Sequence, residues 1–326
     1  MILANEEKGT SMATQALPAE QITTRLLWLD LTRKCQLSCK HCFNESGPEG
    51  THGTMSRADW AGVLDQAAAY GISDIQFIGG EPTMHPHFTE LLDHALTIGL
   101  NVEVYSNLVH VSSECWKLFQ RKGFSLATSY YAAQAEAHDA MTERRSHRLT
   151  RANIEKAVQL AVPLRVGITT NGSGRHADEA LRDLAALGVD KARIRVDRIR
   201  PFGRGADGQA PDMAQLCGRC GSGKAAVSPT GEVSPCPMSA WLGVGNVKRA
   251  PLADILSGAE MARANAAIRI EAGKKDKGSG GGSSGGKGGK GGSGGSGGNG
   301  GGSGPCGPTE DECTPGFPGS SCSPRN

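Results

Sequence analysis

The sequence predicts an α/β protein: a partial (βα)6 TIM-like barrel with a small C-terminal cysteine-rich domain. From about Arg25 to Asp197, short apolar runs alternate with amphipathic segments, and polar or glycine residues directly follow the apolar runs. The ten cysteines, gathered mainly in three groups, predict the second domain. Six strand-helix units are fewer than the eight of a closed barrel, so one side is expected to stay open to a substrate or to a second domain.

The expected strands are short apolar runs, and the helices between them carry apolar residues at three- and four-residue spacing. The strands are Leu26 to Leu31, Asp74 to Ile78, Asn101 to Tyr105, Phe124 to Ser129, Leu164 to Thr169 and Ala192 to Val196. The helices are Arg57 to Tyr70, Phe88 to Thr97, Ser113 to Lys122, Arg151 to Leu160 and Ala177 to Leu187. Ser56 is expected to cap the first helix and Gly71 to end it.

Composition divides the chain into five parts. Residues 1–24 form an N-terminus predicted to be flexible, 25–210 the barrel and 211–272 the cysteine-rich domain; 273–305 form a Gly/Ser/Lys-rich linker and 306–326 a cysteine-containing tail. Between Gly278 and Gly304, 18 of 27 residues are glycine, a composition that cannot bury a core. Such a linker spans roughly 30 Å, so the tail is expected to be able to return to the cysteine-rich domain.

Charge and hydropathy exclude several classes of partner. The formal net charge is +2, which gives no basic field for nucleic acid. No apolar stretch approaches membrane-spanning length, and the N-terminus lacks the features of a signal peptide. We therefore expect a cytoplasmic protein with no membrane partner, whose cysteines bind metal or act in redox chemistry rather than form disulfides.

Three cysteines, Cys35, Cys39 and Cys42, lie within eight residues directly after the first expected strand. A zinc site or an all-cysteine cluster normally uses four protein ligands, so this trio favours an iron-sulfur cluster with one iron open to another ligand. The alternative is a zinc knuckle that a fourth cysteine closes.

Glycine and acidic residues follow the second expected strand. Gly79 and Gly80 let backbone groups approach a ligand closely, and Glu81 offers a carboxylate to a cation. Such a pocket fits an amino acid, whose amine and carboxylate are able to chelate the open iron. The other strands also end in polar residues, although plain turn chemistry explains each of these endings alone.

With its Cys-x3-Cys-x2-Cys spacing and the run Gly79-Gly80-Glu81-Pro82, the chain resembles the radical S-adenosylmethionine (SAM) enzymes. The resemblance implies a [4Fe-4S] cluster on the first cysteine trio that donates an electron to bound SAM and generates a 5′-deoxyadenosyl radical. No protein side chain is assigned a catalytic role beyond the cluster ligands. The resemblance also implies a set of SAM contacts: His41, Gly79, Gly80, Glu81, Asn107, Ser129, Arg144, Thr170 and Asn171. The run Arg200 to Gly205 resembles a loop of this family, or is an exposed basic turn.

Cys217 and Cys220 precede an expected hairpin turned at Pro229-Thr230-Gly231, and Cys236 closes it. This segment resembles the SPASM and "twitch" extensions of radical SAM enzymes, which implies at least one auxiliary [4Fe-4S] cluster. We expect Cys306 as its fourth ligand.

The remaining cysteines are treated separately. Cys115 on an expected helix is interpreted as a small buried hydrophobe, and Cys313 and Cys322 receive no role. The tail from Cys306 is alternatively a tethered peptide substrate or a tag that binds a partner.

The resemblance implies an oxidoreductase that matures a ribosomally synthesised peptide by crosslinking, oxidation or epimerisation. Two alternatives stay open: a radical dehydrogenase of a small molecule such as an aminocyclitol or sugar, and a non-catalytic iron-sulfur scaffold. The partners implied are a peptide or small-molecule substrate, an electron donor such as flavodoxin or ferredoxin, and a separate protein that binds a leader peptide.

Overall fold

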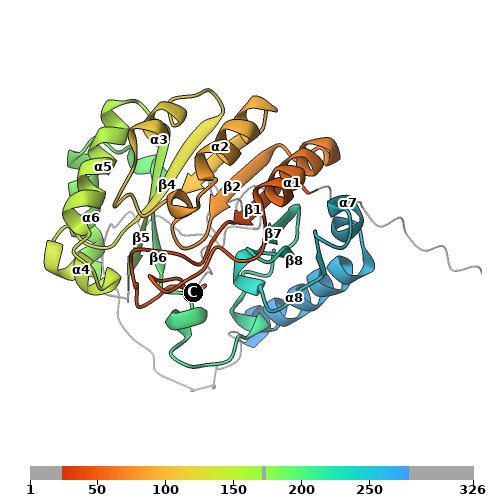
Figure 1. Cartoon of the computed structure of the whole chain (residues 1–326). Coiled ribbons are helices and arrows are strands. Elements are labelled where there is room, and N and C mark those ends of the chain that lie inside the picture. Colours follow the sequence, from red (N-terminus) through yellow and green to blue (C-terminus); the bar gives the residue numbers. More distant parts are fainter. Residues whose placement is uncertain (1–23, 171–173, 279–326) are drawn as a thin grey trace, which may run out of the picture.

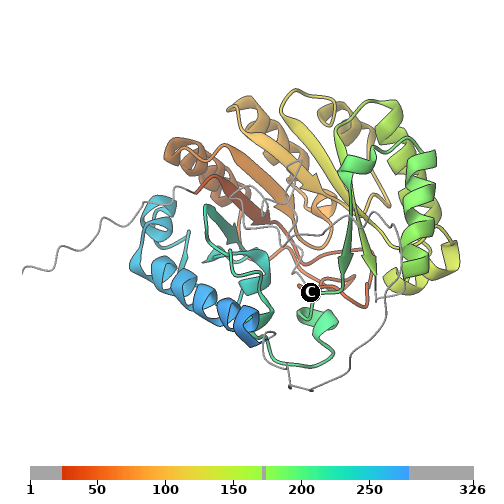
Figure 2. The ribbon, with the colours of Figure 1, turned by 180° about the vertical axis from the view of Figure 1, so that it is seen from behind.

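The computed structural model describes residues 24–170 and 174–278. In this part of the chain, a single sheet has the strand order β6-β5-β4-β3-β2-β1-β7-β8-β9. The strands from β6 to β1 are parallel neighbours, each helix crosses over the outside, and β7 to β9 extend the sheet beyond β1 (Figure 1). The sheet curves into an open barrel, which confirms the predicted fold class (Figure 2).

The N-terminal elements form the barrel. They are β1 (Leu26–Asp30), α1 (Arg57–Tyr70), β2 (Asp74–Ile78), α2 (Phe88–Thr97), β3 (Asn101–Tyr105), α3 (Ser113–Leu118), β4 (Phe124–Tyr130), α4 (Ala135–Thr142), α5 (His147–Gln159), β5 (Leu164–Thr170), α6 (Gly174–Ala186) and β6 (Ile194–Arg198). The C-terminal elements are β7 (Lys224–Val227), β8 (Glu232–Ser234), β9 (Gly245–Asn246), α7 (Leu252–Leu256) and α8 (Ala259–Gly278). Helix α8 continues past residue 273, where the linker is predicted to begin.

Local signals position the first helix as expected. The Ser56 side chain accepts a hydrogen bond from the Asp59 amide at 3.1 Å, and the Asp59 carboxylate accepts from the Ser56 amide at 2.8 Å. Gly71 ends the helix at φ 91°, a conformation that glycine adopts without strain.

Three elements begin elsewhere than the sequence predicts, and one of them, α6, starts at Gly174 rather than Ala177. Helix α5 starts at His147 rather than Arg151, because the Asp139 carboxylate accepts hydrogen bonds from the Ser146 and His147 amides, both at 2.9 Å. Strand β6 starts at Ile194 rather than Ala192, because residues Lys191–Arg193 form a 3-10 turn capped by Asp190.

The two faces of the sheet differ in chemistry. Alternate strand residues such as Leu27, Leu29 and Val104 pack against the outer helices in the main hydrophobic core. The inner face carries polar side chains: the Trp28 indole donates to Gln76 at 2.6 Å, and Gln76 donates to Glu103, which also accepts from Arg165. The barrel interior is therefore suited to a polar ligand.

Because two histidines are buried in the fold, we expect the folded protein to lose stability in acid. Burial lowers the pKa of His85 and of His138 to about 4, with nearby histidines adding to the effect. Below pH 6.5 these two histidines are protonated in the unfolded chain but stay neutral in the folded chain. The free energy of unfolding therefore falls as the pH drops toward 4. At pH 5 each of the two histidines lowers the free energy of unfolding by roughly 2 kcal/mol.

We expect His85→Gln to reduce the loss of unfolding free energy between pH 7 and pH 5 by about that amount. Anaerobic urea unfolding of the reconstituted protein at both pH values measures it. His110→Gln, at an exposed position, serves as the control and should leave the pH dependence unchanged. Equal pH dependence in all three proteins would contradict the prediction.

Candidate active site

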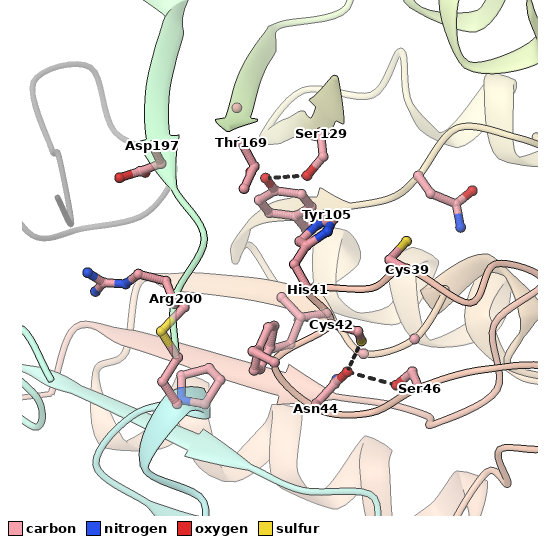
Figure 3. Close-up of a pocket in the computed structure, with 18 of the residues that line it drawn as sticks. Cys39, His41, Cys42, Asn44, Ser46, Tyr105, Ser129, Thr169, Asp197 and Arg200 are labelled. Atoms are coloured by element: carbon pink, nitrogen blue, oxygen red, sulfur yellow. Dashed lines mark hydrogen bonds between the residues drawn. The ribbon is translucent and has the colours of Figure 1, made fainter. Parts of the chain in front are cut away.

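A cavity of about 380 Å³ opens at the carboxyl ends of the barrel strands (Figure 3). Both expected cysteine groups line it: Cys35, Cys39 and Cys42 from the loop after β1, and Cys217, Cys220 and Cys236 from the segment around β7 and β8. Strand β7 runs parallel to β1, with Leu26 opposite Lys224, and this pairing carries the second group to the first.

The first cysteine loop is ordered by contacts with its own backbone and with β1. The Cys35 amide donates to the Gly47 carbonyl at 3.0 Å, and Arg33 forms an ion pair with the buried Asp30 at the end of β1. Burial raises the pKa of Cys35 and of Cys39 to about 12, and neighbouring thiols add to the shift. A cationic centre is what would hold these sulfurs as thiolates near neutral pH.

The loop after β6 clamps the cysteine loop. Arg204 donates from Nε to the Cys39 carbonyl at 2.8 Å and from Nη2 to the Ser46 carbonyl at 2.7 Å. Gly203 has φ 54°, and a Cβ there would lie 2.5 Å from the Cys42 carbonyl oxygen. The expected alternative of an exposed basic turn is therefore wrong: the backbone of one loop rests on the other.

Because the Arg204 guanidinium bonds two carbonyls of the cysteine loop, we expect the amount of cluster bound at the first site to depend on it. Arg204→Lys keeps the charge but cannot reach both carbonyls, and we expect a cost of about 2 kcal/mol in ordering the loop. Iron bound at the first site after anaerobic reconstitution should fall by more than half, as measured by iron analysis and by EPR of the reduced cluster.

Arg121→Lys is the matched control for Arg204→Lys, since Arg121 pairs with Asp93 on the protein surface. If Arg204→Lys bound the full amount of iron, or if both variants lost iron equally, the proposed role of Arg204 in holding the cysteine loop would be wrong.

The glycine motif after β2 packs against the cysteine loop. The Gly80 amide donates to the Thr32 carbonyl at 2.7 Å, and a Cβ on Gly80 would lie 2.3 Å from the Lys34 carbonyl oxygen. Gly79 and Gly80 both line the cavity. Glycine is thus required here for the close approach of two backbones, in addition to any approach of a ligand.

Glu81 is fully buried and, unlike Gly79 and Gly80, is not among the residues that line the cavity. Its carboxylate accepts hydrogen bonds from Thr83, from the Ser106 hydroxyl at 2.9 Å and from the Asn107 amide at 2.8 Å. Burial raises the pKa of Glu81 despite these hydrogen bonds. In this arrangement the side chain joins the ends of β2 and β3, and its contact with SAM stays a prediction.

Three further predicted contacts line the cavity. His41 Nε2 lies 3.2 Å from the Tyr131 hydroxyl, and burial lowers the pKa of His41 to about 4, so the ring is neutral. The side-chain Nδ2 of Asn107 lies 3.6 Å from Cys35 Sγ. Ser129 shares a 3.1 Å hydrogen bond with Tyr105 (Figure 3). His41 Nδ1 is buried with no hydrogen-bond partner in the described chain, and so is available to a ligand.

Two further predicted contacts do not line the cavity. Arg144 and Thr170 are not among its lining residues. Asn171 and Cys306 lie outside the described residues. The roles of these four residues stay predictions.

The second cysteine group is compact. Cys217 Sγ lies 4.0 Å and Cys236 Sγ 3.3 Å from Cys220 Sγ. The hairpin of β7 and β8 is antiparallel as expected, and Gly221 beside Cys220 donates to the Pro235 carbonyl beside Cys236 at 3.0 Å. Hydrogen bonds with Cys217 and Cys236, together with burial, raise the pKa of Cys220. Cys115 is packed in the main core, which confirms its interpretation as a hydrophobe.

The donors present fit two iron-sulfur clusters better than two single ions. In residues 24–170 and 174–278, no three His, Cys, Asp or Glu side chains converge on one metal-ion position. A cluster binds each thiolate at a different iron, so its ligands need not meet at one point. Each trio offers three cysteines to one cavity. Cys35, Cys39 and Cys42 would hold one cluster, and Cys217, Cys220 and Cys236 part of another.

Sequence reasoning missed most of the charged lining. Seven cationic side chains line the cavity: Arg165, Arg195, Arg198, Arg200, Arg204, Arg219 and Lys224. Most lie on or beside β5, β6 and β7, where charged residues in a strand suggest a solvated face. Their alternation with apolar residues was the available signal, but it does not reveal which face points inward.

Comparisons with known proteins agree with this site. Residues 29–170 match the model of the radical SAM superfamily, and residues 217–279 match an iron-sulfur cluster-binding domain, SPASM. The mycofactocin maturase MftC of Mycobacterium ulcerans is 32% identical over 188 residues, which are 56% of this chain and 49% of that protein. A PqqA peptide cyclase of Streptomyces rochei is 26% identical over 270 residues, 70% of this chain and 74% of that protein. This chain spans about half the length of several curated relatives, MftC among them.

A solved structure shares the fold. Streptococcus suis SuiB bound to its precursor peptide SuiA aligns with a TM-score of 0.64 at 16% identity, covering 76% of this chain and 67% of that one. Together with the two cysteine trios on one cavity, the two family matches show that the chain contains a radical SAM domain over residues 29–170 and a SPASM iron-sulfur domain over residues 217–279, which imply a [4Fe-4S] cluster, auxiliary iron-sulfur binding and SAM as cofactors.

Proposed function

We propose that this protein is a radical SAM peptide maturase, which cleaves SAM reductively and modifies a ribosomally synthesised peptide. The observation that carries the proposal is the single cavity lined by both cysteine trios. Two relatives, a mycofactocin maturase and a PqqA peptide cyclase, support a peptide substrate and do not favour a sugar substrate or an inert scaffold.

When bound, the first cluster and SAM supply a 5′-deoxyadenosyl radical that takes a hydrogen atom from the substrate. The protein itself positions the cofactors and the substrate and excludes water from the cavity. The neutral imidazole of His41 lines the cavity; Tyr131 contacts its Nε2, and its Nδ1 has no hydrogen-bond partner in the described chain. Asn107 contacts both Cys35 and the Gln36 side chain, which orients the cluster loop toward β3.

The proposal includes a bond-forming or oxidising outcome, because Cys217, Cys220 and Cys236 would hold part of a second cluster in the same cavity, and that cluster would supply an acceptor for the electron that a substrate radical loses. Cys306 remains the proposed fourth ligand of that cluster. We further propose that flavodoxin or ferredoxin supplies the electrons and that a separate protein presents the leader of the peptide.

We also propose a cytoplasmic location, where thiols stay reduced. Among the described residues, no helix combines the length and apolar character needed to cross a membrane.

The proposed activity is tested in two stages. Anaerobically reconstituted protein, with dithionite and SAM, should release 5′-deoxyadenosine and methionine. Short peptides encoded beside this protein's gene should then be added. The product should have lost one or two pairs of hydrogen atoms, or should contain an epimerised residue at unchanged mass. Release of 5′-deoxyadenosine with no peptide modified, but with a sugar or aminocyclitol oxidised, would overturn the choice of substrate.

A further inference from the structure

The loop that carries the first cysteine trio lies between the cavity and the protein surface. Cys39 and His41 line the cavity, whereas Lys40 between them is exposed and does not line it. A cluster held by this trio would therefore be separated from solvent at this point mainly by the loop itself. Electron transfer between proteins slows steeply with distance, so a donor that docks outside the loop has a short path to the first site.

The turn between α4 and α5 lies against the outside of this loop. The Ser38 amide donates to the Thr142 carbonyl, and the Lys40 amide donates to the Met141 carbonyl, both at 3.1 Å. Figures 1 and 2 show the α4 region beside the loop that follows β1. Two backbone hydrogen bonds thus fix the position of the turn next to Lys40.

Buried polar contacts hold the turn itself in place. The hydroxyls of Thr142 and Ser146 lie 2.8 Å apart, and both residues are buried. Asp139 accepts hydrogen bonds from the amides of Ser146 and His147, which ties the end of α4 to the start of α5. Side chains that project outward from this turn are therefore presented on a fixed backbone, which lowers the entropic cost of binding a partner.

The outward side chains of this region are mainly cationic. Arg145 and Arg148 are exposed, and neither they nor Lys40 makes a side-chain hydrogen bond or ion pair within the part of the chain that the structure describes. Glu143 is the one acidic residue between positions 143 and 148. Leu149, next to Arg148, is a large apolar side chain that is 37% exposed. Apolar contact flanked by charged side chains is typical of protein interfaces.

The position of these cations indicates the kind of partner. Lys40, Arg145 and Arg148 do not line the cavity, so they are not placed to hold SAM or a substrate inside it. Exposed cations attract an acidic protein and speed its association. A donor that reduces the first site while SAM fills the cavity has to approach from outside the loop. Arg144 is exposed in the same turn but stays a predicted SAM contact, and it is not counted in this surface.

We propose that an acidic electron carrier of the flavodoxin type docks on a surface made of Lys40, Arg145, Arg148 and Leu149. One electron leaves the reduced flavin of the carrier, which is oxidised by one step, and the first cluster gains it, so no other reactant is needed. This inference rests on the proposed function and specifies where its electron donor binds.

The test measures the affinity of the full reconstituted protein for oxidised flavodoxin labelled with fluorescein. By fluorescence anisotropy, wild-type binding should be tightest at low salt and weaken as salt is added. Arg145→Glu with Arg148→Glu should weaken binding at low salt by at least ~10-fold, because two attractions become repulsions. With limiting reduced flavodoxin, this double variant should also release 5′-deoxyadenosine more slowly, while dithionite should support the wild-type rate.

Lys122→Glu with Lys191→Glu is the matched control. It makes the same change in net charge, and both lysines are exposed. They precede β4 and β6 and so lie toward the amino ends of the strands, away from the cysteine loop at the carboxyl ends. This variant should bind flavodoxin within about two-fold of the wild type.

Three results would each overturn the docking surface. They are a wild type that shows no salt-sensitive binding, a double variant at Arg145 and Arg148 that binds as tightly as the wild type, and an equal loss of affinity in the control. Release of 5′-deoxyadenosine with dithionite does not depend on the carrier, and its absence in the wild type would instead overturn the proposed function. The two failures are therefore distinguishable.

Discussion

Cys42→Ala is expected to abolish release of 5′-deoxyadenosine, with a loss of at least ~1000-fold under anaerobic reducing conditions. The first trio supplies only three thiols, so removing one leaves two ligands and the cluster should not assemble. Iron analysis should show loss of about four irons per chain from the roughly eight expected for two clusters. Chromatographic measurement of 5′-deoxyadenosine over time gives the rate.

Cys115→Ala provides the matched control for this result. Cys115 is also a buried thiol on the barrel, but it lies in the hydrophobic core on α3 and does not line the cavity. Its variant should bind the full amount of iron and release 5′-deoxyadenosine at the wild-type rate. If Cys42→Ala kept its iron and its rate, the assignment of the first site would be wrong.

Cys236→Ala is expected to have a large effect on a different quantity, the amount of modified peptide. Cys236 lines the same cavity as the first trio but comes from the β8 hairpin, 3.3 Å from Cys220. Its loss removes a ligand of the auxiliary cluster only. We expect modified peptide to fall by at least ~100-fold, while 5′-deoxyadenosine is still released at a rate within a few-fold of wild type.

The two readouts have to be measured in one reaction, with product by mass spectrometry and 5′-deoxyadenosine by chromatography. Cys217→Ala should reproduce the pattern of Cys236→Ala, and Cys115→Ala should change neither quantity. Normal peptide modification in Cys236→Ala would mean that the auxiliary cluster takes no part in the reaction. Loss of both quantities together would mean that the second trio supports the cavity rather than the later step.

Local patterns predicted most of the barrel elements. Helix α1 and strands β2 and β3 have the predicted bounds, because a capping serine, a terminal glycine and short apolar runs act over a few residues. The start of α5 was missed because its cap, Asp139, belongs to the preceding helix α4. That cap depends on how the two helices meet, which periodicity does not reveal.

The site likewise combines features that local sequence predicts with features that depend on tertiary contacts. The trio Cys35, Cys39 and Cys42 was predicted from spacing, since its ligand geometry is local. Arg204 was noticed only as part of a loop resembling one in the family, although its guanidinium holds the Cys39 and Ser46 carbonyls. The hydrogen bonds of the buried Glu81 with Ser106 and Asn107 also needed the structure, because those partners lie just after the next strand, β3.

The amino-acid sequence alone predicted the cysteine trios as cluster ligands and the alternation of the six barrel strands with helices, because spacing and short-range hydrophobic patterns act within a few residues. Only the tertiary structure decided that both trios open on one cavity, since this follows from β7 pairing with β1 across most of the chain. It also decided which arginines face the cavity, because the curvature of the sheet and the crossovers outside it determine which strand face points inward.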